Sequence, residues 1–262
     1  MRRPVILLPP SKGKATGGSG RAYARTLTRH PLTVPRQAVL AAAIASAADP
    51  DDAVVARRCG VGAGGVADAR TSLAGLADAP TMPAHRRYRG IVHGNAGLAE
   101  LRPADATCDV LVVSALMGLV ALDEPVPAYR LEFTATLPAL GGIATFWRDH
   151  LAEELCRRAG RARVWDLLPA EHARMWPVGL RDDLDVIGVR FVRPDGRAAN
   201  AARTKVAKGL LTAHLLANPR TTVAGVVRAC ASARTKQLPG PLGAGWTVTL
   251  DDGGLLATFS DQ

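Results

Sequence analysis

The sequence predicts an α/β (α+β) fold in which a single mixed β-sheet is flanked by helices. Short apolar runs alternate along the chain with longer helix-forming segments, which is the pattern of strands separated by helices. One of these runs, residues 110–113, has the length and β-branched content of a buried strand. Near the end of the chain, two alternating runs at 246–250 and 255–259 surround the polar turn 251–254 and predict a β-hairpin.

The chain of 262 residues is long enough to bury a substantial core. Its residues are 48% hydrophobic but only 4% aromatic, so we expect a core built from Ala, Leu and Val. No internal repeat or linker divides the sequence. We therefore predict a single domain over residues 1–262, with residues 30–87 as a helical subdomain.

The first predicted element is a strand at residues 4–8, which ends at Pro9-Pro10. A loop rich in Gly, Ser and Lys follows at residues 11–20. A strand that leads into such a loop can offer backbone N–H groups and a lysine to a phosphate. The loop does not fit the pattern G-x-x-x-x-G-K-[ST], so we expect no ATP hydrolysis. Lys12 is the first candidate for an anion contact.

Residues 35–48 predict a helix, and residues 49–52 end it and cap a second helix near 52–58. Gly60-Val61-Gly62 then precedes a third helix near 65–76, and this order resembles a helix-hairpin-helix. In that motif the helix N-terminus presents N–H groups to a DNA phosphate without reading sequence. An ordinary turn would give the same pattern. The nucleic-acid-binding candidates are Arg57, Arg58, Gly60, Gly62, Gly65 and Arg70.

After the strand at 110–113, we expect a loop between Pro125 and Pro127 and then a strand at residues 129–133. Along that strand, alternation would place Arg130 and Glu132 together on one face. Such a pair can bind an anion or position a proton, although it can also be a structural ion pair that holds the loop.

The remaining elements follow from periodicity. Trp147 lies on the apolar face of an amphipathic helix and is expected in the core. Lys205 and Lys208 lie three residues apart, which predicts that both occupy one face of a helix. The predicted ranges are a short helix at 95–101, a helix at 144–159, a strand at 164–168, a short helix at 169–176, a strand at 186–192, and helices at 201–217 and 221–231.

The net charge of +10 is concentrated in two segments. Residues 1–48 and residues 196–236 each contain eight Lys or Arg and no Asp or Glu. If the fold brings them together, they form a positive surface for phosphate-bearing partners. If it does not, they are separate solvated faces.

The four cysteines have no C-x-x-C spacing and are predicted to be free thiols in a reducing cytoplasm. No run of eighteen apolar residues and no secretory signal pattern is present, so we expect a cytoplasmic protein without a membrane partner. No His, Asp or Glu cluster has metal-ligand spacing, and we expect no metal and no cofactor.

Three separated motifs resemble, in order, those of the peroxide stress protein YaaA family. They are V-I-L-L-P-P-S-K-G-K at 5–14, S-A-L-M-G followed by Y-R-L-E-F and F-W between 114 and 147, and T-K-V-A-K-G-L-L at 204–211. The chain is similar to a divergent, actinobacterial-type member. It departs from the family pattern at His93, where Tyr is usual, and also at Met117, Ala121, Leu122 and residues 166–169.

The resemblance implies a cytoplasmic protein that binds DNA through a helix-hairpin-helix during oxidative stress. The alternative is an enzyme of specialised or nucleotide metabolism that binds an anionic phosphate- or carboxylate-bearing small molecule. In that case Lys12, Arg130, Glu132, Lys205 and Lys208 would form the pocket, and Glu132 or a desolvated lysine would move a proton. A basic scaffold without a site is a third possibility. Binding to double-stranded DNA would weaken steeply with salt, whereas a small ligand would respond far less.

Overall fold

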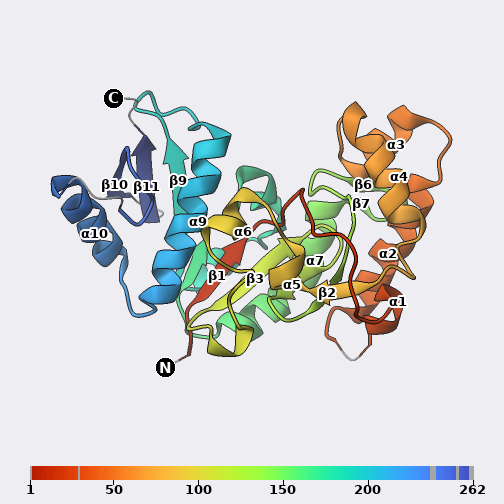
Figure 1. The fold of residues 1–262 in the computed structure, drawn as a ribbon, viewed down its shortest axis with the longest axis horizontal. Coiled ribbons are helices and arrows are strands. Elements are labelled where there is room, and N and C mark those ends of the chain that lie inside the picture. Colours follow the sequence, from red (N-terminus) through yellow and green to blue (C-terminus); the bar gives the residue numbers. More distant parts are fainter. Residues whose placement is uncertain (1, 29, 237–239, 252–253, 260–262) are drawn as a thin grey trace.

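The computed structural model describes residues 2–28, 30–236, 240–251 and 254–259 (Figure 1). Within them, seven strands form one mixed sheet, as the sequence predicts. In spatial order the strands are β10 (Trp246–Asp251), β11 (Gly254–Phe259), β9 (Val186–Val192), β8 (Val164–Asp166), β1 (Val5–Leu8), β3 (Asp109–Ser114) and β4 (Gly118–Ala121).

The centre of the sheet is parallel. Strand β1 pairs in parallel with β3 on one side and with β8 on the other, and β9 and β11 extend the parallel run. The edge strands β4 and β10 are antiparallel to their neighbours. The carboxyl ends of β1, β3, β8 and β9 therefore lie along the same edge of the sheet.

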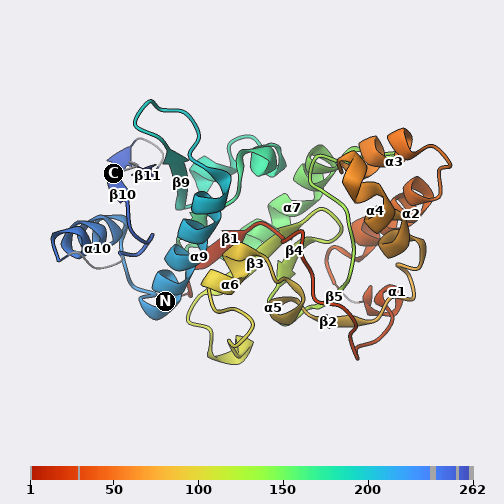
Figure 2. The same ribbon diagram turned by 45° about the horizontal axis from the view of Figure 1, so that its top comes forward.

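Helices form the rest of the architecture. Their bounds are α1 (Tyr23–Thr26), α2 (Thr33–Ala47), α3 (Asp52–Cys59), η1 (Ala63–Gly65), α4 (Val66–Ala74), α5 (Ala84–Arg87), α6 (Ile91–Asn95), η2 (Pro103–Asp105), α7 (Ile143–Ala159), η3 (Ala170–Met175), α8 (Leu180–Asp183), α9 (Ala201–Ala217) and α10 (Val223–Thr235). Helices α2, α3 and α4 gather at one end of the molecule, and α10, β10 and β11 gather at the other (Figure 1, Figure 2).

The core has two parts because both faces of the sheet are covered. Side chains of β1 alternate between them: Val5 and Leu7 pack with residues of α2, α3, α4 and α7, whereas Ile6 and Leu8 pack with residues of α6 and α9. Trp147 in α7 is fully buried, as predicted. The parallel strands are thus buried on both sides, which explains their continuous apolar sequences.

Most predicted elements are present, with small shifts of their ends. The predicted hairpin is confirmed as β10 and β11, although residues 252–253 of its turn lie outside the described residues. The four cysteines are free thiols, as predicted. The short helix expected at 95–101 is instead α6 at Ile91–Asn95, and the segment expected at 169–176 is a 3-10 helix.

Two predictions in the middle of the chain are wrong. The expected loop at Pro125–Pro127 is a short strand, β5, which pairs with β2 (Thr81–Pro83). The expected strand at 129–133 has no strand pairing, because the backbone N–H of Glu132 donates to the carbonyl of Cys59 in helix α3 (3.0 Å). A second small sheet, β6 (Thr136–Leu137) with β7 (Gly141–Gly142), follows it.

Candidate functional site

The site begins where β1 ends. Ser11 is buried, its hydroxyl donates to the carbonyl of Gly13, and it accepts from the backbone N–H of Arg89 (3.1 Å). These bonds fold the loop back over the carboxyl edge of the sheet. As a result Lys12 points outward, with 70% of its side chain exposed, whereas Lys14 is directed inward and its Nζ donates to the carbonyl of Ser11 (2.9 Å).

Lys14 lies against two aromatic rings. Its Nζ is 3.9 Å from the ring centroid of Tyr129 and 5.7 Å from that of Tyr88. The two tyrosine hydroxyls are 3.1 Å apart, and that of Tyr129 is 2.7 Å from the hydroxyl of Ser114, the last residue of β3. The amine is therefore enclosed by a fixed aromatic and hydroxyl cluster rather than by bulk water.

The charge state of Lys14 reflects these surroundings. Burial lowers the pKa of Lys14 to about 7; Arg130 and Arg87 act in the same direction, and Glu132 acts against them. The contact with the Tyr129 ring also favours the ammonium form. The balance leaves Lys14 with a substantial neutral fraction at physiological pH, a form in which an amine can accept a proton or act as a nucleophile.

Lys12, Arg130 and Glu132 meet above the same loop. Oε1 of Glu132 is 3.3 Å from Nη1 of Arg130 and 4.0 Å from Nζ of Lys12. Arg130 is largely buried, and its Nε has no hydrogen-bond partner. The structure thus brings together three of the five residues predicted for the pocket, and Glu132 partly offsets the two cations.

Residues 60–65, which connect α3 to α4 and were predicted to form the turn of a helix-hairpin-helix, pack directly on this cluster; they are called the hairpin below. The carbonyl of Gly60 accepts from the hydroxyl of Thr134 (3.3 Å), and a side chain at Gly65 would lie 3.7 Å from Nη2 of Arg130. The two candidate sites, which are about 70 residues apart in the sequence, are therefore contiguous in space.

Helices α3 and α4 are both present and are joined by residues 60–65, the segment predicted to be the turn of a helix-hairpin-helix. Asp51 caps α3 by accepting from the N–H of Ala53 (2.7 Å), and Gly60 ends that helix in the left-handed conformation (φ 70°). The turn 62–64 is exposed, and η1 leads into α4. The exposed residues thus precede α4, whose first residue, Val66, is buried and whose first turn carries Asp68.

The three arginines of α3 and α4 are not equivalent. Arg57 is exposed. Arg58 instead pairs with Asp49 (2.8 Å), and Arg70 binds Asp52 (2.7 Å) and the carbonyl of Ala47 (2.8 Å). Arg58 and Arg70 therefore stabilise the connection between α2 and α3. This structural role could not be predicted from the residue type alone.

The two predicted lysines of helix α9, Lys205 and Lys208, differ in burial. Lys205 is exposed, whereas Lys208 is buried with its Nζ 5.7 Å from the ring centroid of Phe191. Residues three apart differ by about 60° around a helix axis, and the boundary of the buried face of α9 falls between them. The prediction that they share one face is therefore wrong in this respect.

Lys208 belongs to a second cluster along the carboxyl edge. Burial lowers the pKa of Lys208 to about 8, against the opposing effect of Asp166 and Glu171. Burial and the charge of Lys208 lower the pKa of His172 to about 3. The His172 ring stacks on Phe133 (4.0 Å between centroids), so the segment 130–133 connects this cluster with the first.

Asp166 anchors the second cluster from the end of β8. Its carboxylate accepts from Nε1 of Trp176 (3.1 Å) and from the N–H of Leu168 (3.0 Å), and it pairs with Arg181. Ser114, Asp166 and the loop after β1 all follow parallel strands. Ligands of open α/β sheets bind at this edge, which makes it the natural place for a site.

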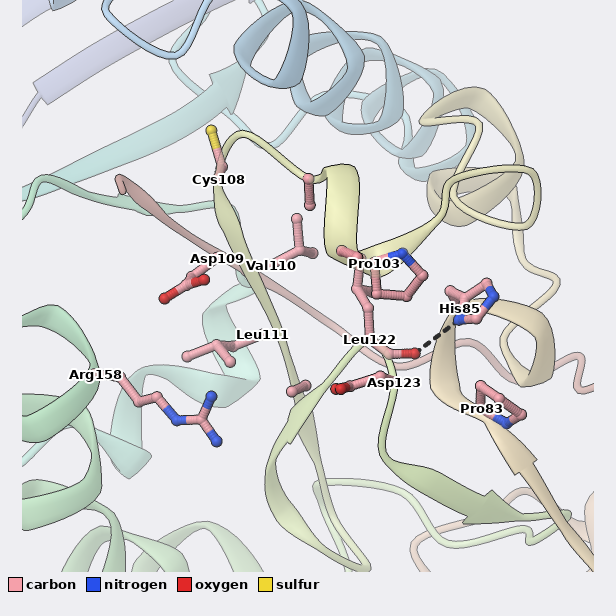
Figure 3. Close-up of a pocket in the computed structure, with 13 residues that line it drawn as sticks. Pro83, His85, Pro103, Cys108, Asp109, Val110, Leu111, Leu122, Asp123 and Arg158 are labelled. Atoms are coloured by element: carbon pink, nitrogen blue, oxygen red, sulfur yellow. Dashed lines mark hydrogen bonds between the residues drawn. The ribbon is translucent and has the colours of Figure 1, made fainter. Parts of the chain in front are cut away.

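Two hollows in the described residues lie away from these clusters. A hollow of about 510 Å³ lies at the amino end of β3, between Cys108, Leu122 and Arg158 (Figure 3). His85 on its rim contacts the carbonyl of Leu122 through Nδ1 (2.8 Å). A second, of about 350 Å³, is lined by residues 218–221. Neither hollow contains a predicted site residue.

Parts of the two basic segments lie far apart, so not all of their charges share one surface. Helix α2 carries part of the first and α10 part of the second, and they lie at opposite ends of the molecule (Figure 1). Within the described ranges, no group of three or more His, Cys, Asp or Glu side chains is placed to hold a metal ion. No described helix is long and apolar enough to cross a membrane.

Two functional candidates, Lys14 and His172, were not selected from the sequence. Lys14 lies in the same motif as Lys12 with only Gly13 between them, but the sequence does not show which of the two lysines faces inward. His172 carries no local signal. His93 is the hydrogen-bonded packing residue that its position suggests, with Nε2 3.0 Å from the carbonyl of Pro9.

Comparison with known proteins gives one consistent result. Residues 5–232 match the family model described as Peroxide stress protein YaaA. A UPF0246 protein of Streptomyces coelicolor is 32% identical over 218 residues, which cover 81% of this chain and 83% of the relative. A UPF0246 protein of Corynebacterium efficiens is 30% identical over 256 residues, covering 95% of this chain and 96% of the relative.

Proposed function

The chain belongs to the peroxide stress protein YaaA family, and from this premise we propose that it binds nucleic acid without sequence preference during the peroxide stress response. The observation that carries the proposal is that the exposed turn 62–64 leads into Gly65, where a Cβ would lie 3.7 Å from Nη2 of Arg130, and that Arg130 and Lys12 both contact Glu132. The proposed phosphate-binding turn is thus close to a group of cations, which supports the proposal.

The physical basis is contact with the phosphate backbone. The N–H groups at the start of α4 carry the positive end of the helix dipole and favour an anion. Arg57 and Lys12 are exposed and add mobile positive charges on either side of the turn. Contacts of this kind provide affinity and orientation but read no bases.

We expect Arg57→Ala to weaken binding to a short duplex and to reduce the slope of log affinity against log salt by about 1, because one phosphate contact is lost. The measurement is fluorescence anisotropy of a labelled duplex across a salt series. Arg102→Ala is the matched control, since it removes an equally exposed charge (84%) before β3. Equal effects of the two substitutions would contradict the hairpin as the interface, and absence of wild-type binding at moderate salt would refute nucleic-acid binding altogether.

A second candidate function is an enzyme acting on an anionic small molecule. It is favoured by the buried Lys208, which lies beside His172 and Asp166 at the carboxyl edge of the sheet. A screen of nucleotides and sugar phosphates by thermal shift tests it. A ligand that stabilises the wild-type protein but not Lys208→Met would support this reading, and no stabilisation by any anion would exclude those classes.

A further inference from the structure

Lys14 combines three properties that distinguish it from the exposed cations Lys12 and Arg57. It is partly buried, it lies against the rings of Tyr129 and Tyr88, and it is influenced by both Arg130 and Glu132. A structural lysine at such a position would ordinarily pair with the carboxylate. Instead Glu132 contacts Arg130 and Lys12, and Lys14 donates to a backbone carbonyl. The amine of Lys14 therefore forms no salt bridge with a carboxylate of the described residues.

We propose that Lys14 is a reactive amine that condenses with an aldehyde attached to a phosphate ester, and that this aldehyde is the open-chain deoxyribose of an abasic site in DNA. The inference rests on the proposed function, because the hairpin supplies the phosphate contact. An abasic sugar carries its aldehyde between two phosphates. Arg130 lies beside Gly65 and acts electrostatically on Lys14, and Lys12 contacts the same Glu132, so cations are available close to the amine for the phosphates of such a ligand.

The reaction needs only the groups present. The neutral Nζ attacks the aldehyde carbon and forms a C–N bond. The two hydrogens of the amine end on the aldehyde oxygen, which leaves as water when the C=N bond forms. No oxidant or reductant is consumed. Glu132, whose charge acts on Lys14, is the carboxylate that we assign to the proton transfers.

The division of roles follows from exposure. Lys12, with 70% of its side chain exposed, suits a contact with backbone phosphate. Lys14, held against aromatic faces, suits a reaction that requires an unprotonated amine in a site from which water is partly excluded. Two lysines separated by one glycine would thus have different tasks.

The test is reductive trapping. Wild-type protein is incubated with a duplex containing one abasic site and with sodium cyanoborohydride, and the covalent complex is quantified on a denaturing gel and mapped by peptide mass spectrometry. Lys14→Met and Lys14→Arg are each expected to reduce trapping by at least roughly tenfold, since neither side chain can form the imine. Lys236→Ala, an exposed lysine after α10, is the control and is expected to leave trapping unchanged.

Three further results separate the parts of the inference. Adduct at another lysine, or undiminished trapping by both Lys14 variants with native melting temperatures, would overturn it. Trapping of ribose 5-phosphate at Lys14 without any trapping of the abasic duplex would refute DNA as the source of the aldehyde. Affinity for the intact duplex, measured in parallel, reports the proposed nucleic-acid binding separately, because Lys14 is not among the exposed cations.

Discussion

Replacing Arg87 by methionine is expected to lower the free energy of unfolding by roughly 4 kcal/mol, because several buried carbonyls lose a charged donor at once. Arg87 is fully buried in α5. Its guanidinium donates to the carbonyls of Val126 (3.0 Å), Gly17 (2.8 Å) and Pro80 (3.0 Å), and also to that of Ala15. Methionine fills most of the space but cannot donate.

The same change should also release the segment that follows Lys14. Arg87 is what ties residues 15–17 to strands β2 and β5, so loss of its bonds frees the loop that positions the amine. Urea denaturation followed by tryptophan fluorescence measures the stability. Arg86→Met is the matched control, since Arg86 is exposed on the same short helix. A loss below about 1 kcal/mol would show that water replaces the guanidinium without cost.

Trp147→Ala is expected to cost about 3–5 kcal/mol, the range for removal of a large aromatic side chain from a core. The Trp147 ring is fully buried in α7, and its Nε1 donates to the carbonyl of Ala115 (2.8 Å). A Cβ added at Gly118 would lie 2.8 Å from the ring, which shows how closely β4 approaches it. The space left by alanine cannot be filled without moving that strand.

A second substitution at this position separates packing from hydrogen bonding. Trp147→Phe keeps an aromatic ring but removes the N–H, and about 1–3 kcal/mol is expected for the buried carbonyl that loses its donor. Val178→Ala serves as the control, since Val178 is 99% exposed and its loss should change stability by less than about 0.5 kcal/mol. If Trp147→Ala fell within the control range, the described packing of α7 on the sheet would be wrong.

The trapping reaction proposed for Lys14 should depend on pH in a defined way. Burial and two guanidinium groups lower the pKa of Lys14 to about 7, so the neutral amine increases as pH rises through 7 and changes little above pH 8. An ordinary lysine, with a pKa near 10.4, would keep gaining neutral amine up to pH 10. The rate of wild-type trapping between pH 6 and 9 measures this difference. A rate that increases tenfold per unit throughout that range would contradict the lowered pKa.

The sequence predicted the sheet and the long helices because their signals are local. Strand β3 is a continuous apolar run, and helix α3 has a capping aspartate before it and a glycine after it. Such features depend on a few neighbouring residues. Their positions could be assigned without knowledge of what they pack against.

The errors come from contacts that are distant in the sequence. Residues 129–133 alternate between buried and partly exposed side chains as a strand would, but the backbone partner of Glu132 is Cys59, more than 70 residues away. Likewise, Lys205 and Lys208 differ only because α9 buries one edge against the sheet. Periodicity gives the direction of a side chain but not the identity of its neighbour.

The candidate site was predicted in part for the same reason. Lys12, Arg130 and Glu132 were selected by residue type and motif, and the structure places them together. Arg58 and Arg70 were selected by the same logic, yet Asp49 and Asp52 bind them. Whether a cation near a candidate site is held by a carboxylate of the fold depends on tertiary structure, which residue type and motif do not show.

The position of β1 constrains how the protein is made. This strand is synthesised well before its two neighbours, which are β3, about 100 residues later, and β8, which ends at Asp166. The central strand must therefore wait, with four apolar side chains unpaired, until more than half of the chain has been synthesised. At about 5–20 residues per second this delay lasts several seconds or more, during which the nascent N-terminal segment depends on the ribosome or on chaperones to keep it from aggregating.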